Sequence, residues 1–247
     1  MKLLMSYMKS ILGKVEIVLM FLGWSVVVSG QITTAPTGLS TVKNLYHGID
    51  ISHYNGDEVK EIDGSDSLTF IICKATQGTK IVDKDFKMNW ATIKSKKMLL
   101  GTYHFYVVGE DPVKQAEHYF QTINVMGKRD IAGVVDIEQG SIPKGYKVDV
   151  AQLQADLLKF IAVLQSKINR VPMIYTCTGF ANQYLNNKEF SKYPLWLAEY
   201  TKAVHPKIPA TWQKTGYRIW QKSENYQINS KPTDYDVYYG SLADLCK

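Results

Sequence analysis

The sequence predicts an α/β fold, a flattened and irregular TIM-like β/α barrel with few helices in its C-terminal half. Three observations support this prediction. From residue 46 onward, short apolar runs bounded by turn residues alternate with segments of helical periodicity. The runs are apolar throughout instead of alternating, which is typical of parallel strands covered by helices. Clear helical periodicity ends at residue 168, although strand-like runs continue to residue 238.

Each expected strand is a short run rich in β-branched or aromatic residues. In chain order these runs are Tyr46–Ile51, Leu68–Lys74, Leu99–Phe105, Ile131–Ile137, Val171–Thr176, Leu195–Glu199, Arg218–Trp220 and Tyr235–Tyr238. Helices are expected over Asp83–Lys97, Pro112–Val125 and Val150–Ile168. The last segment has a stripe of apolar residues at helical spacing, formed by Leu153, Leu157, Phe160, Ile161 and Leu164. Barrels of this type carry their active sites at the C-terminal ends of the strands, so we expect functional residues there.

The first 30 residues have the order of a secretory signal. Lys2, Lys9 and Lys14 precede an apolar run over residues 17–28, which Ser29 and Gly30 follow. The run is shorter than the ~20 residues that span a bilayer, so we expect a cleaved signal over 1–30, with an uncleaved anchor as the alternative. A Thr-, Ser- and Pro-rich spacer is expected over 31–45 and the functional domain over 46–247. The mature chain is expected to be secreted or periplasmic, monomeric and without an integral membrane segment.

Composition indicates a mildly basic globular protein. Apolar residues make up 45% of the chain and charged residues 21%, which are ordinary values. Removal of the signal would lower the net charge from +6 to +4. This mild positive charge would attract an anionic polymer such as bacterial wall, with solubility alone as the alternative, and the scattered basic residues do not fit nucleic acid. Cys73, Cys177 and Cys246 form neither a disulfide framework nor a zinc site by their spacing.

The chemistry is concentrated in the stretch GVVDIEQGS, where two acids end an apolar strand. Asp136 and Glu138 are two positions apart, so both side chains project from the same face of the strand. Two neighbouring carboxyls resist ionising together, so one is expected to hold a proton near neutral pH. A protonated acid beside an ionised one is the pair that cleavage of a glycosidic bond requires. The structural alternative is a pair of acids that cap the following turn.

Two further strands also contain acids between apolar residues. Asp50 lies in HGIDISHYNG, and Asp236 lies in TDYDVYYG. A carboxylate in such a strand is costly unless it is hydrogen-bonded or functional. Together with Asp136 and Glu138 these acids could instead bind Mg²⁺ or Ca²⁺. Neither the EF-hand spacing nor a His-rich ligand set is present, so we expect no metal and no cofactor.

Eight motifs in order resemble glycoside hydrolase family 25, the Chalaropsis-type lysozymes or N-acetylmuramidases. They are GIDISHYNG at 48–56, FIICKATQGT at 70–79, GTYHFY at 101–106, VVDIE at 134–138, PMIYT at 172–176, PLWLAEY at 194–200, IWQ at 219–221 and DYDVYYG at 234–240. The resemblance covers nearly all of residues 46–245 and implies a flattened β/α barrel with a long groove. It implies hydrolysis of the β-1,4 bond between N-acetylmuramic acid and N-acetylglucosamine in bacterial peptidoglycan.

The resemblance also implies roles for the acids. Glu138 matches the general acid, and Asp136 matches the partner that assists the 2-acetamido group of the substrate or stabilises an oxocarbenium-like transition state. Asp50 and Asp236 match the remaining acids of the family's cluster, with positioning and electrostatic roles. One residue departs from the pattern, because Gln77 stands where the family commonly has Glu.

Aromatic residues at strand ends are expected to wall the sugar subsites, with core packing as the alternative. Tyr103 and Phe105 alternate on one strand and should face inward together. The other candidates for substrate binding are Tyr175, Trp196, Trp220 and Lys74. Lys74 should form an ion pair with a neighbouring carboxylate, and His104 should point away from the barrel centre. The alternatives to a muramidase are a non-catalytic glycan-binding barrel and a metal-dependent cell-wall hydrolase.

Overall fold

The computed structural model describes residues 42–63, 67–124, 126–228 and 231–247. The predicted signal segment and most of the predicted spacer lie outside the described residues. The strands are β1 (Asn44–Ile51), β2 (Phe70–Gln77), β3 (Ile81–Val82), β4 (Leu99–Phe105), β5 (Val134–Asp136), β6 (Met173–Cys177), β7 (Leu195–Ala198), β8 (Ile219–Ile228) and β9 (Lys231–Gly240). The helices are α2 (Glu58–Glu61), α3 (Phe86–Ser95), α4 (Pro112–Ile123), α5 (Val150–Ile168), α6 (Thr178–Tyr184) and α7 (Leu242–Leu245), with short 3-10 turns η2 (Gln139–Ser141), η3 (Lys188–Lys192) and η4 (Ala210–Trp212).

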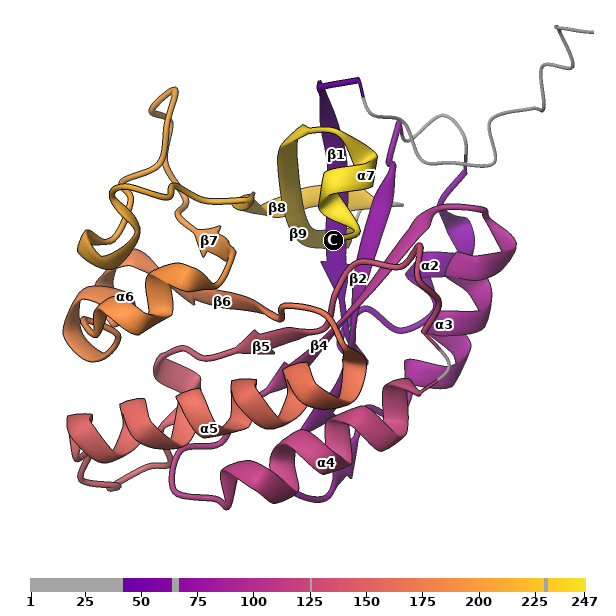
Figure 1. Cartoon of the computed structure of the whole chain (residues 1–247). Coiled ribbons are helices and arrows are strands. Elements are labelled where there is room, and N and C mark those ends of the chain that lie inside the picture. Colours follow the sequence, from indigo (N-terminus) through magenta and orange to yellow (C-terminus); the bar gives the residue numbers. More distant parts are fainter. Residues whose placement is uncertain (1–41, 64–66, 125, 229–230) are drawn as a thin grey trace, which may run out of the picture. The chain divides into compact units, whose positions relative to one another are not determined.

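The strands close into a barrel, as the sequence predicts (Figure 1). The order around it is β1-β9-β8-β7-β6-β5-β4-β2, and β2 pairs back to β1. Every pairing that does not involve β9 or β3 is parallel, and these pairings join β1, β2, β4, β5, β6, β7 and β8. Strand β9 is antiparallel to both β1 and β8, and the short β3 adds to the edge of β2.

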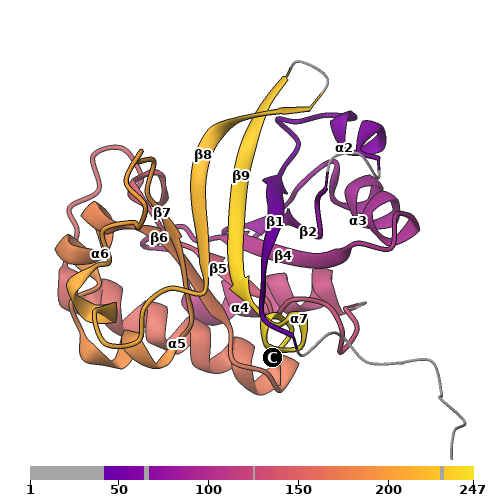
Figure 2. The ribbon, with the colours of Figure 1, turned by 90° about the horizontal axis from the view of Figure 1, so that it is seen from above.

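Helices cover the barrel unevenly, which confirms the predicted shortage in the C-terminal half. Helices α4 and α5 lie side by side along strands β4 to β6 (Figure 1). After β6 only short helical pieces occur within the described residues, and β8 joins β9 as a long hairpin (Figure 2). An antiparallel hairpin needs no crossover helix, so this part of the barrel lacks one. The hairpin strands exceed the predicted bounds because their outer residues are polar and carry no apolar signal.

Local signals in the sequence explain the bounds of the long helices. Asp111 caps α4 by accepting hydrogen bonds from the backbone N–H groups of Val113 and Lys114, and Pro112 occupies the first turn. Asp149 caps α5 in the same way through Gln152 N–H. Helix α5 ends at Asn169, which adopts the left-handed conformation with φ 52°. Its predicted apolar stripe is fully buried.

Alternation along the strands divides the buried residues into two layers. Outward-facing side chains pack against the helices and form the main apolar core, which includes Ile49, Ile51, Ile71, Cys73, Val135, Ile137, Ile174, Leu195 and Leu197. Inward-facing side chains fill the barrel. Near the N-terminal ends of the parallel strands they are apolar, such as Phe70, Val134 and Met173. Packing is tight there, because a Cβ on Gly48 would lie 2.2 Å from the Phe70 ring.

The same alternation makes the other end of the barrel interior polar. Further along the strands, the inward positions are Asp50 on β1, Lys74 on β2, Asp136 on β5 and Gln221 on β8, all of them buried. The C-terminal ends of the strands therefore enclose a polar chamber above an apolar floor. All three cysteines are free. Within the described residues, no helix combines the length and apolar character that crossing a membrane would need.

Candidate active site

A cavity of about 220 Å³ opens at the C-terminal ends of the parallel strands. Seven strands and the loops after β1 and β5 contribute to it, so residues distant in the sequence share one chamber. Its walls are formed by Asp50, Ser52, Tyr54, Lys74, Tyr103, Phe105, Asp136, Glu138, Tyr175, Trp196 and Asp234. Three of the four acids and five of the six substrate-binding residues predicted from the sequence are therefore together. We call this cavity the acidic pocket.

The two acids of β5 lie at different depths in the acidic pocket. Asp136 is 7% exposed, and its Oδ1 atom has no hydrogen-bond partner among the described residues. Glu138 is only half-buried, and its backbone N–H donates to Ser141 Oγ at 3.1 Å, which fixes the turn after β5. Burial raises the pKa of Asp136 well above its ordinary value, with a further contribution from Glu138. Burial also raises the pKa of Glu138, so its protonated form persists to higher pH than that of an exposed glutamic acid.

Lys74 lies beside these acids but does not form the predicted ion pair. No carboxylate oxygen of the described residues lies within salt-bridge distance of its ammonium group, which instead donates to Gln77 Oε1 at 2.8 Å and lies 4.7 Å from the centre of the Phe105 ring. Burial lowers the pKa of Lys74, against the opposing effect of Asp136. Its positive charge in turn lowers the pKa values of Asp136 and Glu138.

A hydrogen-bond chain orients Asp50 on β1. Gln221 donates from Nε2 to Asp50 Oδ2 at 2.6 Å, and its Oε1 atom accepts from the hydroxyls of Tyr175 at 2.9 Å and Tyr200 at 2.7 Å. Two hydroxyl donors on Oε1 fix which way the amide points, so the amide nitrogen must face Asp50. Burial raises the pKa of Asp50 well above its ordinary value, with help from the nearby Asp236 and Asp234.

The structure separates the two acids of β9, and only one of them reaches the cavity wall. Asp236 is fully buried beneath it, where Trp196 Nε1 donates to its Oδ1 atom at 2.7 Å. Its Oδ2 atom has no hydrogen-bond partner among the described residues. Asp234, which the sequence reasoning missed, lies opposite Asp50 in the β1–β9 register and lines the acidic pocket. Burial raises the pKa of Asp234 to about 6.

Aromatic side chains form one wall of the acidic pocket, but Trp220 is not among them. Tyr103 and Tyr175 meet the Trp196 ring edge-on, at centroid distances of 6.4 and 4.7 Å. Trp220 pairs with Leu197, an outward-facing position, and its Nε1 donates to Glu199 O at 2.8 Å. Strand alternation thus turns Trp220 to the outside of the barrel, contrary to the predicted place in the pocket.

The loop after β1 supplies two wall residues that the sequence reasoning also missed, Ser52 and Tyr54. Tyr54 is 86% exposed and its ring lies 4.1 Å from the His53 ring. His53 is held by Asp83, whose Oδ2 atom lies 2.6 Å from its Nδ1. The predicted orientation of His104 is observed, because its ring contacts Thr76 and Gln115 on the helix side of the sheet.

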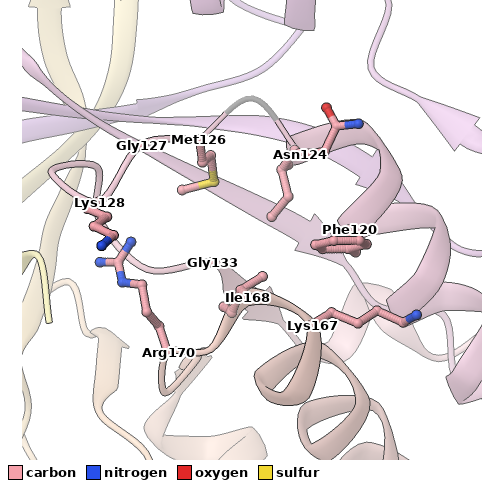
Figure 3. Close-up of a pocket in the computed structure, with 10 residues that line it drawn as sticks. Phe120, Asn124, Met126, Gly127, Lys128, Gly133, Lys167, Ile168 and Arg170 are labelled. Atoms are coloured by element: carbon pink, nitrogen blue, oxygen red, sulfur yellow. The ribbon is translucent and has the colours of Figure 1, made fainter.

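A second cavity, of about 200 Å³, lies at the opposite end of the barrel between the C-terminal ends of α4 and α5 (Figure 3). It contains none of the predicted site residues. Two of its three cations already have partners: Lys167 pairs with Glu117 at 3.6 Å, and Arg170 donates to the carbonyls of Asp130 and Cys246, while Lys128 is the third. In the described part of the chain, no group of three or more His, Cys, Asp or Glu side chains is arranged to hold a metal ion.

The acidic pocket has the parts that acid-assisted cleavage of a sugar linkage requires. Glu138 has a raised pKa and faces solvent, so it can deliver a proton to an oxygen bound in the pocket. Asp136, two positions away on the same face, can lie beside positive charge that develops on a neighbouring carbon. The aromatic wall offers flat surfaces for sugar rings.

Comparisons with known proteins agree with this chemistry. The profile of the family Glycosyl hydrolases family 25 matches residues 49–231. The uncharacterized protein YegX of Escherichia coli K12 is 27% identical over 206 residues, which is 81% of this chain and 71% of YegX. Lysozyme M1 of Streptomyces globisporus is 27% identical over 226 residues, 86% of this chain and 73% of that protein. The structure of a family GH25 lysozyme from Aspergillus fumigatus superposes with a TM-score of 0.73 at 28% identity, covering 82% of this chain and 98% of that one.

The buried acid Asp236 predicts an unusual pH dependence of stability. Its pKa is raised in the folded state, chiefly by burial, so the folded chain holds the proton more tightly than the unfolded chain does. The free energy of unfolding therefore falls as pH rises from about 4, the unfolded pKa, through the folded pKa. Asp236→Asn keeps an acceptor for Trp196 and cannot ionise. Its melting temperature should exceed that of the wild type by a margin that grows between pH 5 and 8, about 2–4 °C for each ~1 kcal/mol relieved.

The matched control is Asp244→Asn. Hydrogen bonds from Lys247 and Ser241 lower the pKa of the exposed Asp244, so its contribution to stability has the opposite sign and is present above the unfolded pKa. This variant should melt at or below the wild-type temperature at pH 7. A difference between Asp236→Asn and wild type that does not change with pH would contradict the prediction.

Proposed function

The chain belongs to family 25 of the glycosyl hydrolases, and we propose that Glu138 is the acid with which it cleaves the glycan strands of peptidoglycan. The enzyme is a muramidase of lysozyme type and hydrolyses the β-1,4 bond between N-acetylmuramic acid and N-acetylglucosamine. The observation that carries the residue assignment is the placement of Glu138 and Asp136 on one face at the end of β5, at different depths in the acidic pocket.

In the proposed reaction Glu138 transfers its proton to the glycosidic oxygen while the bond between that oxygen and the anomeric carbon breaks. The electron pair of the bond stays with the leaving oxygen, which becomes the hydroxyl of the departing sugar. Positive charge then develops on the anomeric carbon. Water finally adds to this carbon, and its proton returns to Glu138, so that the enzyme is restored.

We assign Asp136 the role of stabilising the positive charge, either directly or through the 2-acetamido group of the substrate. Its buried position supports this role, since a charge acts more strongly where water is excluded. Burial raises the pKa of Asp136 and so opposes its ionised form, and the charge of Lys74 counters this effect; the same charge also lowers the pKa of Glu138. The sugar rings would be held against the pocket wall by Tyr103, Tyr175, Trp196 and Phe105.

For β9 we propose Asp234 as the acid that faces the substrate and Asp236 as its support. Asp234 lines the acidic pocket opposite Asp50, whereas Asp236 lies beneath Trp196. Asp50 is oriented by Gln221, so Gln221 would act on the reaction by positioning this carboxylate.

Replacement of Glu138 by Gln tests the proposed acid. The amide keeps the shape of the side chain but cannot deliver a proton, so the release of reducing ends from purified peptidoglycan should fall by about 10²-fold or more. Mass spectrometry of the wild-type digest should show the new reducing ends on muramic acid. The melting temperature of Glu138→Gln should stay close to that of the wild type. Near-normal turnover in a folded Glu138→Gln protein would overturn the assignment.

Gln77→Glu tests how the charge of Lys74 tunes the acid. Lys74 now lowers the pKa of Glu138, and a carboxylate at 77 would pair with Lys74 and cancel this effect. The pKa of Glu138 should therefore rise. Because the general acid must be protonated, the basic limb of the pH–rate profile should move to higher pH by about 0.5–1 unit. Gln77→Met, which removes the hydrogen bond without adding charge, should move the limb less, and an unchanged limb in Gln77→Glu would contradict the assignment.

We also propose that the protein is exported and that residues 1–30 are removed. The basic start, the short apolar run and the small residues at 29–30 support this proposal. The protein recovered from the medium or periplasm of an expressing cell should lack these residues, as the mass of its N-terminal peptide will show. An intact N-terminus on protein that stays in the cytosol would refute the proposal.

A further inference from the structure

A third cavity, of about 360 Å³, lies at the N-terminal ends of β7 and β8, where the antiparallel β9 ends. The acidic pocket is at the other end of the same strands. Four tyrosines and one arginine characterise the cavity: Tyr193, Tyr217, Tyr238, Tyr239 and Arg218. We call it the tyrosine pocket. None of the residues assigned to glycan cleavage lines it.

The tyrosines provide both a rigid wall and an open aromatic face. Tyr238 is 5% exposed, its ring stacks on Tyr46 at 6.3 Å, and its hydroxyl donates to Ser241 O at 3.0 Å. Tyr239, the next residue, is 72% exposed. Aromatic rings beside a cavity suit sugar units, which pack an apolar C–H face on a ring and hydrogen-bond at the rim.

Arg218 adds a positive charge whose donors are not used within the described protein. Its side chain is half-buried, and burial lowers the pKa of its guanidinium group. Its backbone N–H donates to Leu195 O, but the guanidinium group makes no hydrogen bond or ion pair with any residue that the structure describes. The nearby carboxylate of Asp244 already pairs with Lys247 and accepts from Ser241 Oγ. Arg170 differs, because its guanidinium group donates to two carbonyls.

A partly desolvated guanidinium group without a partner forms a strongly favourable interaction with an anionic ligand. The planar fork of Arg matches the oxygens of a carboxylate or phosphate in pairs. Lys192 also lines the cavity, but it already pairs with Glu189 at 2.5 Å, so among the described lining residues Arg218 is the cation that remains for a ligand. The combination of aromatic walls with this fork therefore selects for a sugar unit that carries an acidic group.

We propose that the tyrosine pocket is a second glycan-binding site, which holds an anionic saccharide unit of the cell wall while the acidic pocket cleaves. This proposal rests on peptidoglycan as the substrate. The two pockets lie at opposite ends of the barrel, so they would contact different strands or distant parts of the polymer. Two linked contacts raise the effective affinity for an insoluble polymer without changing the chemistry at either one. The acidic group can be a carboxylate of the peptidoglycan or a phosphate of a polymer attached to it.

Binding to purified walls tests the proposal when cleavage is switched off. All proteins carry Glu138→Gln, and the fraction bound to sedimented walls is measured at limiting wall concentration. Adding Arg218→Gln should lower the apparent affinity about tenfold, which is the usual effect of losing a charge-assisted hydrogen bond. Tyr239→Ala should lower it as well. The matched control is Lys214→Gln, which removes one exposed positive charge close in the sequence without touching the tyrosine pocket.

Two wall preparations identify the source of the anionic group. If removal of attached phosphate polymers with hydrofluoric acid abolishes the difference between Arg218→Gln and Lys214→Gln, the ligand is a phosphate. If the difference persists, the ligand is a carboxylate of the peptidoglycan. Equal binding of these two variants on both preparations would overturn the proposal.

Activity on short soluble glycans completes the test. With Glu138 intact, Arg218→Gln should cleave purified soluble muropeptide oligomers at the wild-type rate, because these reach only the acidic pocket. A matching loss of turnover on the oligomers would place the effect at the catalytic end and overturn the proposal. The muramidase function is checked independently, by the reducing ends that the wild-type enzyme releases from the same walls. A failure of the binding site and a failure of the function are therefore distinguishable.

Discussion

The central constraint on this molecule is the enclosure of several carboxyl groups in one barrel end that water barely enters. Asp50, Asp136 and Asp236 are each at most 7% exposed. Burial penalises the charged form of every one of them, and repulsion from neighbouring carboxylates, among them Asp234, adds to the penalty. They cannot all be ionised together, so the site must retain protons at a pH where ordinary carboxyls have lost them. Burial of the carboxyl groups thus lowers the stability of the folded state, and the same burial keeps a carboxyl group protonated so that it can act as an acid.

The surrounding donors decide where negative charge can remain. Lys74 forms no ion pair with a carboxylate of the described residues, and its charge acts on Asp136 and Glu138 across the pocket. The amide of Gln221 and the indole of Trp196 favour the ionised forms of Asp50 and Asp236, respectively. Each donor sits on a different strand, so the charge pattern depends on the closure of the barrel and not on any one segment. A local motif such as VVDIE can place acids on one face, but it cannot set their proton affinities alone.

Sequence patterns predicted the elements and most of the site because both follow from alternation along strands. The spacing of two residues was enough to place Asp136 and Glu138 on one inward face, and likewise Tyr103 and Phe105. Depth within the barrel was not predictable in the same way. Asp234 and Asp236 share a face, and only the antiparallel register that sets Asp234 opposite Asp50 shows which one reaches the cavity. The prediction that Trp220 lines the pocket was wrong for a related reason. The short predicted strand gave no indication of which of its alternating side chains face the interior. The contact of Lys74 with Gln77 depends on the register shift after Lys74, which no periodicity reports.

Closure of the barrel by its last strand has a consequence for how the enzyme comes into being. Thr233 on β9 donates to the backbone of Asp50 on β1, across a separation of 183 residues, and the neighbouring positions bring Asp234 to the cavity. Contacts of such long range form late and slowly. Until these contacts have formed, the cavity lacks the part of its wall that Asp234 contributes. The acidic pocket is therefore completed late in folding, when β9 pairs with β1.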